Sequence, residues 1–596
     1  MSVLETPRLI FRGQVTWDPI VTNNQPQQYD ENDSKTVFDS SAANVAAFRK
    51  AAIDAVVNAG NWNPHGTHRA TFYGTTITGV DTGSGPSTAD PIVNNPVSFL
   101  GMLVDLEPYG AYSSQLFFDA MSFGIQGGCR VFAPRTTRMT GRYINFARNT
   151  TFNPQIDPNV VAGGASVVWQ TSFPKSSGLR IDAHDSQALR SLNQKLEDDD
   201  VIGLTVRWNA YLTRYFDSLV PSNNPGLAQQ LHDKLVGGGF QPNPARSHLV
   251  GVLGLWRKGE PAGEPGDRAL LTRRPKQMAS AHVRLSSDRL TLDLANSVPE
   301  TGVDLTKLNL GNLTAFVVTP GTNTVIGKLG TFGFESYQRE AYDKTAGIVS
   351  INVEPTAAQA ALTADIQLRQ DNGTVLLAET ALRAIPAAAN NYLDEGQTES
   401  LDVMVLNRGK PAGAGINVTM ANPDASNAAS VTQPTNAQGI AAFSITGTTG
   451  QVEGFVLTPQ GTPPAPGINP QTTTYVYVRT LPADADIAAL APTWDNVHGR
   501  VLRNWHAMAP CMDNWLDLGN PDQVKSFATM LHKLTDRANF EAFRYMPVTR
   551  DMTAGQRALL YKFLDGTQHV LEALEVAAPE PSLKQMSRAM RGGPLV

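Results

Sequence analysis

The chain has 596 residues, of which 41% are hydrophobic and 17% are charged, and its formal net charge is −6. At roughly 100–200 residues per domain, this length predicts about three to five domains. The composition excludes a disordered chain, a coiled coil and a collagen, and the acidic balance gives no general attraction to nucleic acid or to an anionic membrane. We therefore expect a multidomain, mainly β protein with inserted helices and no nucleic-acid partner.

The first 383 residues are expected to form a β-rich region, either as one unit or as two subdomains. Short runs of β-branched and aromatic residues that stop at turn-forming residues indicate strands, and apolar residues at helical spacing indicate helices inserted between them. The strands are expected at residues 9–17, 201–208 and 250–256, and the helices at residues 45–56, 189–196 and 227–235.

Charged residues become scarce between residues 392 and 482, where Thr, Ala, Gly and Val dominate. Strand-like runs alternate with turns, one of them at residues 407–410. This pattern predicts an immunoglobulin-like β-sandwich over residues 384–482. The segment resembles the bacterial immunoglobulin-like domains of invasin-type proteins, a resemblance that implies a fold and no function.

Residues 483–596 are expected to form a helical region. Apolar residues recur at helical spacing from residue 497 to residue 515, in a helix that Pro510 should kink or split. A second helix is expected to open at residues 520–521. Residues 553–556 are a capping-box signature for a third.

The cysteines and the N-terminus bear on the cellular compartment. Cys129 and Cys511 are too few for a disulfide framework or a zinc cluster. One long-range disulfide and two reduced thiols both stay open, and we favour the thiols. The sequence starts without the pattern of a signal peptide, and no apolar run reaches the ~18–20 residues of a membrane span. We expect a cytoplasmic protein.

Strong catalytic motifs are missing from the sequence: no phosphate-binding glycine loop, no H-E-x-x-H and no paired Cys-x-x-Cys. The catalytic residues are therefore unknown. The acidic run 197–200 offers carboxylates to Mg²⁺ or Ca²⁺, but consecutive side chains point in different directions, and we expect a solvated turn between helix and strand. Four arginines could bind an acidic ligand or partner, with a solvated face as the simpler expectation: Arg135, Arg138, Arg142 and Arg148.

Three histidines are candidates for holding a metal or a cofactor. His65 and His68 lie three residues apart in an expected loop and could ligate a metal, although no third ligand is evident. His506 flanks the apolar stripe of its helix, as an axial haem ligand or a proton carrier would. The alternative for His506 is a residue at the edge of the core. The metal candidates are thus His65 and His68, and the cofactor candidates are His68 and His506.

Four stretches resemble, in this order, the N-terminal, non-ferritin half of iminophenyl-pyruvate dimer synthases and chromopyrrolic acid synthases: residues 7–13, 196–206, 250–260 and 545–550. The resemblance implies a place in natural-product metabolism, where these synthases oxidatively couple two indole-pyruvate imines and some members are associated with haem. Their iron-binding, ferritin-like region lies C-terminal to the matched half. We expect this chain to lack that region, so the oxidative chemistry is not carried over.

The first functional hypothesis is therefore a scaffold or partner-binding protein of secondary metabolism, with a separate ferritin-like oxidase chain as its partner. The alternative is a haem- or metal-dependent oxidase that uses the histidines above. A second alternative, an adhesin-like binding module, is suggested by residues 392–482 and disfavoured by the missing signal peptide. Whether the chain is an enzyme and how it oligomerises stay open; no cofactor is evident, and haem or iron are the candidates.

The sequence position of Arg550 predicts contacts of its side chain. It precedes a helix, where the positive end of the helix dipole disfavours a cation. We expect Arg550 to pair with a carboxylate or with backbone carbonyls of the β-rich region, and so to clamp the helices onto it. An exposed side chain is the alternative.

Overall fold

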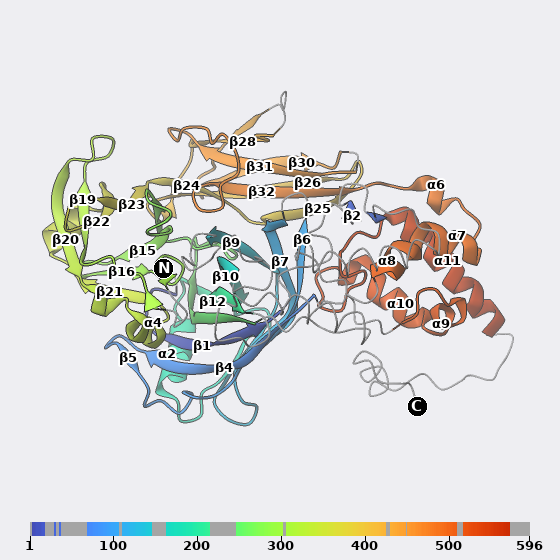
Figure 1. Cartoon of the computed structure of the whole chain (residues 1–596), viewed down its shortest axis with the longest axis horizontal. Helices are drawn as coiled ribbons and strands as arrows, with labels where there is room; N and C mark the ends of the chain where they lie inside the picture. Colours follow the sequence, from blue (N-terminus) through green and yellow to red (C-terminus); the bar gives the residue numbers. More distant parts are fainter. Residues whose placement is uncertain are drawn as a thin grey trace.

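The computed structural model describes residues 3–17, 29–30, 35–36, 68–106, 110–145, 163–214, 246–301, 306–424, 430–448, 450–508 and 516–571. Within these residues the chain is mainly β, with a helical region at its C-terminal side (Figure 1). The predicted fold class, a multidomain and mainly β protein with a helical C-terminal region, is confirmed. The helices expected at residues 45–56 and 227–235 lie outside the described residues, as do His65, Arg148 and Cys511.

The first sheet closes on itself as a ring of eight antiparallel strands. The ring closes because β7 pairs with β9 as well as with β6. Its strands are β1 (Arg8–Thr16), β4 (Arg69–Asp81), β6 (Val97–Leu106), β7 (Gly110–Gly124), β9 (Met139–Asn145), β10 (Gly163–Pro174), β12 (Val201–Arg214) and β13 (Arg246–Arg257). Shorter elements attach to it: β5 (Pro86–Ser87), β8 (Arg130–Pro134), β11 (Arg180–Asp182) and the helix α2 (Gln187–Leu196).

Side chains fill the interior of this ring. Alternate residues of each strand point inward, and the inward set is apolar. Trp169 stacks on Trp208 with ring centroids 5.7 Å apart, and Phe72 meets Trp208 edge-on at 5.2 Å. The ring is therefore a packed core. Its polar residues lie on the outer face, where other parts of the chain cover many of them.

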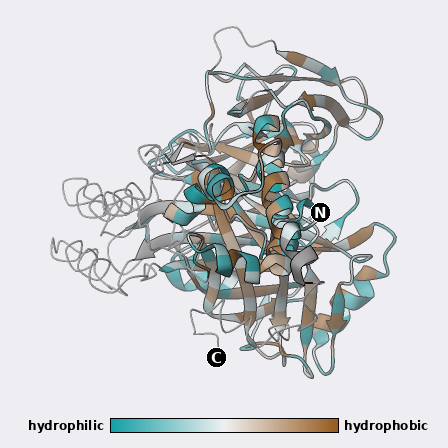
Figure 2. Ribbon diagram, turned by 90° about the vertical axis from the view of Figure 1, so that its right-hand side faces the viewer, coloured by the Kyte–Doolittle hydropathy of each residue, from teal (hydrophilic) through white to brown (hydrophobic). Residues whose placement is uncertain are grey.

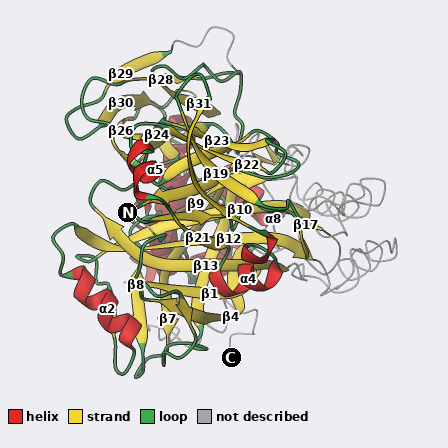
Figure 3. Ribbon diagram, turned by 90° about the vertical axis from the view of Figure 1, so that its left-hand side faces the viewer, coloured by secondary structure: helices red, strands yellow, loops and turns green. Residues whose placement is uncertain are grey.

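A second sheet of eight strands follows, with a separate core that includes Leu270, Leu292 and Ile366. Its strands are β14 (Arg268–Thr272), β15 (Ala281–Leu285), β16 (Arg289–Asp293), β19 (Leu313–Val318), β20 (Val325–Phe332), β21 (Ile348–Asn352), β22 (Asp365–Gln370) and β23 (Val375–Thr380). Its short helices are η2 (Phe334–Ser336), α4 (Arg339–Thr345) and α5 (Pro355–Ala360); α4 and α5 stand out among the strands in Figure 3. Two small ribbons form separate two-stranded sheets: β2 (Tyr29–Asp30) with β3 (Lys35–Thr36), and β17 (Glu300–Thr301) with β18 (Thr306–Lys307).

Two further sheets pack face to face as a sandwich. Leu401, Val403 and Phe443 from one sheet share a core with Val418 and Val476 from the other. The first sheet holds β24 (Leu382–Pro386), β26 (Thr398–Asn407), β27 (Lys410–Pro411) and β30 (Ile440–Thr446); the second holds β25 (Asn390–Asp394), β28 (Asn417–Ala421), β29 (Val431–Pro434), β31 (Val452–Pro459) and β32 (Thr474–Leu481). Its assignment to the immunoglobulin type stays a prediction, as do the limits 1–383, 384–482 and 483–596.

The helical region has a small core of its own, which includes Val497, Trp505 and Leu560. Its elements are α6 (Ala485–Ala488), α7 (Trp494–Val497), the π-helix η3 (His498–Leu502), α8 (Arg503–Met508), α9 (Pro521–Ser526), α10 (Ala528–Thr535), the 3-10 helix η5 (Arg537–Asn539) and α11 (Ala554–Leu571). Figure 2 views this end of the molecule and shows helices that carry both apolar and polar residues. The single helix expected after residue 520 is instead two, because Phe527 leaves helical geometry with φ −104° and ψ 20°.

The sandwich lies along the first ring and the second sheet, and the helical region packs beside β6, β7 and β25 (Figure 1). Contacts between these units therefore involve residues far apart in sequence. Among the described residues, no helix is long and apolar enough to cross a membrane.

Candidate functional site

A tight hairpin of the sandwich reaches over the second sheet. Arg408 and Gly409 join β26 to β27 with φ values of 48° and 77°, the left-handed pair that a two-residue hairpin needs. Glycine is required at the second position for another reason: a Cβ there would lie 3.1 Å from the backbone nitrogen of Arg268. The turn expected at residues 407–410 thus presses against the start of β14.

Arg408 ties this hairpin to the second sheet. Its guanidinium donates to Asp365 Oδ1 at 2.6 Å and to the carbonyl of Ala364 at 3.2 Å. The same loop is held from below by Arg268, which donates to the carbonyls of Ala361 and Ala364 at 2.7 and 2.9 Å. Two arginines from different units therefore fix one loop.

Arg268 also forms a bidentate ion pair with Glu379. The two nitrogen–oxygen distances are 2.7 and 2.5 Å, and both side chains are buried. Burial raises the pKa of Glu379, and Arg268 opposes that effect. The guanidinium of Arg268 is thus fully occupied in holding the structure.

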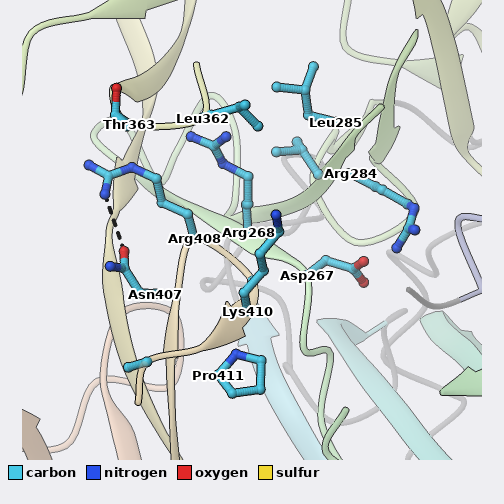
Figure 4. A pocket seen from close by; sticks show the side chains of 13 residues that line it. Asp267, Arg268, Arg284, Leu285, Leu362, Thr363, Asn407, Arg408, Lys410 and Pro411 are labelled. Atoms are coloured by element: carbon cyan, nitrogen blue, oxygen red, sulfur yellow. Dashed lines mark hydrogen bonds between the residues drawn. The ribbon is translucent and has the colours of Figure 1, made fainter. Parts of the chain in front are cut away.

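A pocket of about 480 Å³ lies between the hairpin and strands β14 and β15 (Figure 4). Lys410 is exposed and points into it, whereas Asp267 turns its carboxylate away and accepts a hydrogen bond from Arg207 at 3.1 Å. Arg284 extends away from the centre to pair with Glu5, and burial lowers the pKa of Arg284 to about 10. The pocket therefore presents positive charge together with apolar surface.

The floor of the pocket continues into a buried polar junction of the ring, the second sheet and the sandwich. Arg207 of β12 donates to Asp267 at 3.1 Å and to Asp293 at 2.9 Å. Arg383 of β24 donates to the carbonyl of Asp267 at 3.0 Å and to the hydroxyl of Tyr143. Burial raises the pKa of Tyr143 to about 12, so the phenol stays protonated.

His68 lies at the edge of the first ring and is buried. Its Nδ1 donates to the carbonyl of Leu103 at 2.9 Å. Burial and, to a smaller extent, the nearby charge of Arg550 lower the pKa of His68 to about 4. The imidazole is therefore neutral at pH 7. Its proposed part in holding a metal or cofactor stays a prediction, because the partner histidine, His65, lies outside the described residues.

His506 lies in a different setting, in the helical region. Its Nδ1 is 3.1 Å from Nε2 of His498, and its Nε2 is 3.9 Å from Asp517 Oδ1. Burial and then Arg503 lower the pKa of His498. Among the residues that the structure describes, no group of three His, Cys, Asp or Glu side chains could hold a metal ion. The cofactor role of His506 stays a prediction.

Two of the arginines that follow Cys129, Arg138 and Arg142, do not belong to a solvated face, which corrects the simpler expectation for them. Arg142 is buried and pairs with Glu264 at 2.8 Å, and Arg138 pairs with Glu541 of the helical region. They bind acidic groups of the same chain because the folded units bring these carboxylates to them. Cys129 itself is a buried free thiol, 3.4 Å from the carbonyl of Ala183.

The acidic run 197–200 is confirmed as a turn. Helix α2 ends at Leu196 and β12 begins at Val201. Lys195 pairs with Asp198 at 3.0 Å, and Arg257 pairs with Asp200 at 2.6 Å. The carboxylates of Asp198 and Asp200 are therefore paired with neighbouring cationic side chains.

Sequence reasoning missed the pocket residues. It identified the turn at residues 407–410 without assigning a role to Lys410, and it passed over Arg268. The usable signal was the pair of cations that flank Gly409 in a segment otherwise poor in charge. Their partners on β14, β15 and residues 361–365 could not be inferred from the local sequence.

No protein-family model matches the chain. A stretch of 116 residues is 37% identical to the 2-imino-3-(indol-3-yl)propanoate dimerase of Chromobacterium violaceum. The chain is related to this dimerase over part of its length. The stretch covers 19% of this chain and 9% of the dimerase, so it confirms the expected resemblance only as a partial, family-level link.

Solved structures add little. The chain aligns with Salmonella α2-macroglobulin at a TM-score of 0.13 and 9% identity, over 64% of this chain and 26% of that chain. It aligns with the S-layer protein rSbsC at a TM-score of 0.12 and 10% identity, over 70% of this chain and 53% of that chain. Scores this low carry no argument about fold or function.

Proposed function

We propose that the chain is a scaffold or partner-binding protein of natural-product metabolism, located in the cytoplasm. The observation that carries the proposal is the buried polar junction, in which Arg142, Arg207 and Arg383 join three β units. Buried charges with several partners hold groups in one arrangement, as a scaffold requires. The partial similarity to the dimerase supports a setting in secondary metabolism.

We propose that the helical region is the part of this scaffold protein that faces the partner. It is fastened to the β units by Arg138, which pairs with Glu541, and by Arg550, whose guanidinium lies 3.8 Å from the ring centroid of Phe117. The proposed partner is a separate ferritin-like oxidase chain, which would supply the oxidative chemistry that the dimerase-type resemblance implies.

Co-elution tests this proposal. The purified chain is mixed with purified ferritin-like oxidase chains of its source organism and separated by size exclusion with light scattering. A stoichiometric complex, with oxidative coupling only in the mixture, is the expected result. Coupling by the isolated chain would contradict a scaffold role, and so would the failure of every candidate oxidase to bind.

The alternative function, a haem- or metal-dependent oxidase, is favoured by one observation. His498 and His506 form a partly exposed imidazole pair within and just after a π-helix, an element that often occurs at functional sites. Neutral imidazole nitrogens are common metal ligands. Metal analysis and an absorption spectrum decide: a Soret band or stoichiometric iron, lost in His506→Ala, supports the oxidase, and a colourless, metal-free protein argues against it.

A further inference from the structure

We infer that the pocket between the β26–β27 hairpin and strands β14 and β15 binds a small organic monocarboxylate, with Lys410 as the residue that receives the carboxylate. The inference does not depend on the proposed scaffold role. It rests on the volume of the pocket, on the pairing of the charges that line it, and on the apolar surface beside Lys410.

The volume and position suit a small molecule. Ligand pockets commonly measure about 300–1,000 Å³ and often lie where two units meet. This pocket has a volume of about 480 Å³ and is lined by both the second sheet and the sandwich. Its walls are held in place, because Arg268 and Arg408 both bind the loop at residues 361–365.

Almost all charged side chains that line the pocket form ion pairs with other residues of the protein. Arg268 pairs with Glu379, Arg408 with Asp365, and Arg284 with Glu5. Asp267 pairs with Arg207. Of the charged residues that line the pocket, all of them described, Lys410 alone has no ion pair in the structure, so it is the cation available to a ligand.

This pattern selects the class of anion. Arginine forks recognise phosphate groups with two parallel hydrogen bonds, but the forks of Arg268 and Arg408 are occupied by carboxylates and carbonyls. A single lysine ammonium is a point charge with three donors, which suits one carboxylate. Beside it, Leu285, Pro411 and the half-exposed Leu362 offer apolar surface to the body of the ligand.

Calorimetric titration of the full chain at low ionic strength tests the inference, with benzoate, its neutral analogue benzamide and inorganic phosphate as probes. We expect benzoate to bind and both other probes to bind more weakly. Lys410→Ala should weaken benzoate binding by about threefold to fivefold, as loss of an exposed ion pair does. Added salt should weaken it as well.

Lys276→Ala is the matched control, because Lys276 is an exposed lysine between β14 and β15 of the second sheet and does not line the pocket; this variant should bind benzoate as the wild type does. Three results would overturn the inference: no benzoate binding, equal affinity for benzoate and benzamide, or unchanged affinity in Lys410→Ala. Phosphate binding tighter than benzoate would overturn the choice of a monocarboxylate. A thermal melt shows that each variant is folded.

Discussion

Arg550 shows how a side chain at an unfavourable position is held. It is fully buried, and it donates to the carbonyls of Val548 and Ala542 at 2.8 and 2.9 Å. Those carbonyls belong to its own segment, so the expected hydrogen bonds to the β-rich region are wrong. The clamp exists in another form, because the guanidinium stacks on Phe117 of β7 at 3.8 Å. Burial lowers the pKa of Arg550 to about 10.

Replacing Arg550 should therefore destabilise the protein. Arg550→Ala removes a desolvated cation–π contact and two hydrogen bonds, and we expect a loss of about 2–4 kcal/mol in the free energy of unfolding. Chemical denaturation measures it, with the exposed Arg544→Ala as the control. An unchanged free energy of unfolding in Arg550→Ala would show that the stacking does not clamp the helices.

His68 predicts a pH dependence of stability. Its pKa in the folded protein is lowered by burial to about 4, below the ordinary value of 6.5. The unfolded chain therefore binds more protons than the folded chain between these values. The contribution of neutral His68 is fully present above pH 6.5 and is lost as the pH falls toward 4, by about 3 kcal/mol at most.

The free energy of unfolding, measured at several pH values in this window, checks the prediction. His68→Gln should flatten the pH dependence, whereas the exposed His184→Asn should leave it unchanged. The same slope in the wild type and in His68→Gln would mean that other groups set the acid sensitivity.

At the scale of elements, local signals located ends and turns well. The capping box opens α11 as expected: Thr553 Oγ1 accepts from the backbone of Gln556 at 3.2 Å, and Gln556 Oε1 accepts from the backbone of Thr553 at 3.0 Å. Asn520 caps α9 in the same region by accepting from two backbone N–H groups. The break at Phe527 was missed, because the apolar spacing continues through it.

Removing the N-terminal cap of α11 tests how much the capping box contributes to stability. Thr553→Ala should lower the free energy of unfolding by about 1–2 kcal/mol, since it also removes the hydrogen bond to Asp484 at 2.7 Å. Ser526→Ala in α9, where the hydroxyl is exposed, is the control and should have little effect. A melting temperature that shifts equally in both variants would contradict a special role for the cap.

At the scale of the whole molecule, buried ion pairs hold the β units together. Arg207 on the outer face of the ring reaches Asp267 and Asp293 of the second sheet, and all three side chains are buried. Burial opposes the charged form of Arg207, but its two carboxylate partners prevail and raise the pKa of Arg207. The stability of this buried junction thus depends on Arg207 and both of its carboxylate partners being present.

Arg207→Ala should cost about 3–5 kcal/mol, because it leaves two carboxylates buried without their cation. Arg500→Ala is the matched control: it breaks an Arg–Asp pair of 3.1 Å whose side chains are 52% and 74% exposed, and such pairs contribute about 0–1 kcal/mol. Denaturant titrations of both variants give the comparison. Equal losses would show that burial does not set the strength of these pairs.

The sequence by itself determined what depends on neighbours along the chain: the strands around residues 9–17 and 201–208, the turn at residues 407–410, the acidic turn at 197–200 and the capping box at Thr553. Periodicity and turn chemistry act over a few residues, so these features can be read locally. The change from strand-like to helical spacing of apolar residues separated the β-rich chain from its helical end.

Only the tertiary structure decided which distant charges meet. The sequence could not show that Arg142 is buried against Glu264, that β7 closes a ring by pairing with β9, or that Lys410 faces a pocket built by β14 and β15. Each of these depends on chain segments far apart in sequence arriving side by side, and the burial that results decides whether an arginine is solvated or paired. The pocket is formed by the second sheet and the sandwich together, and for that reason the sequence of neither unit predicts it.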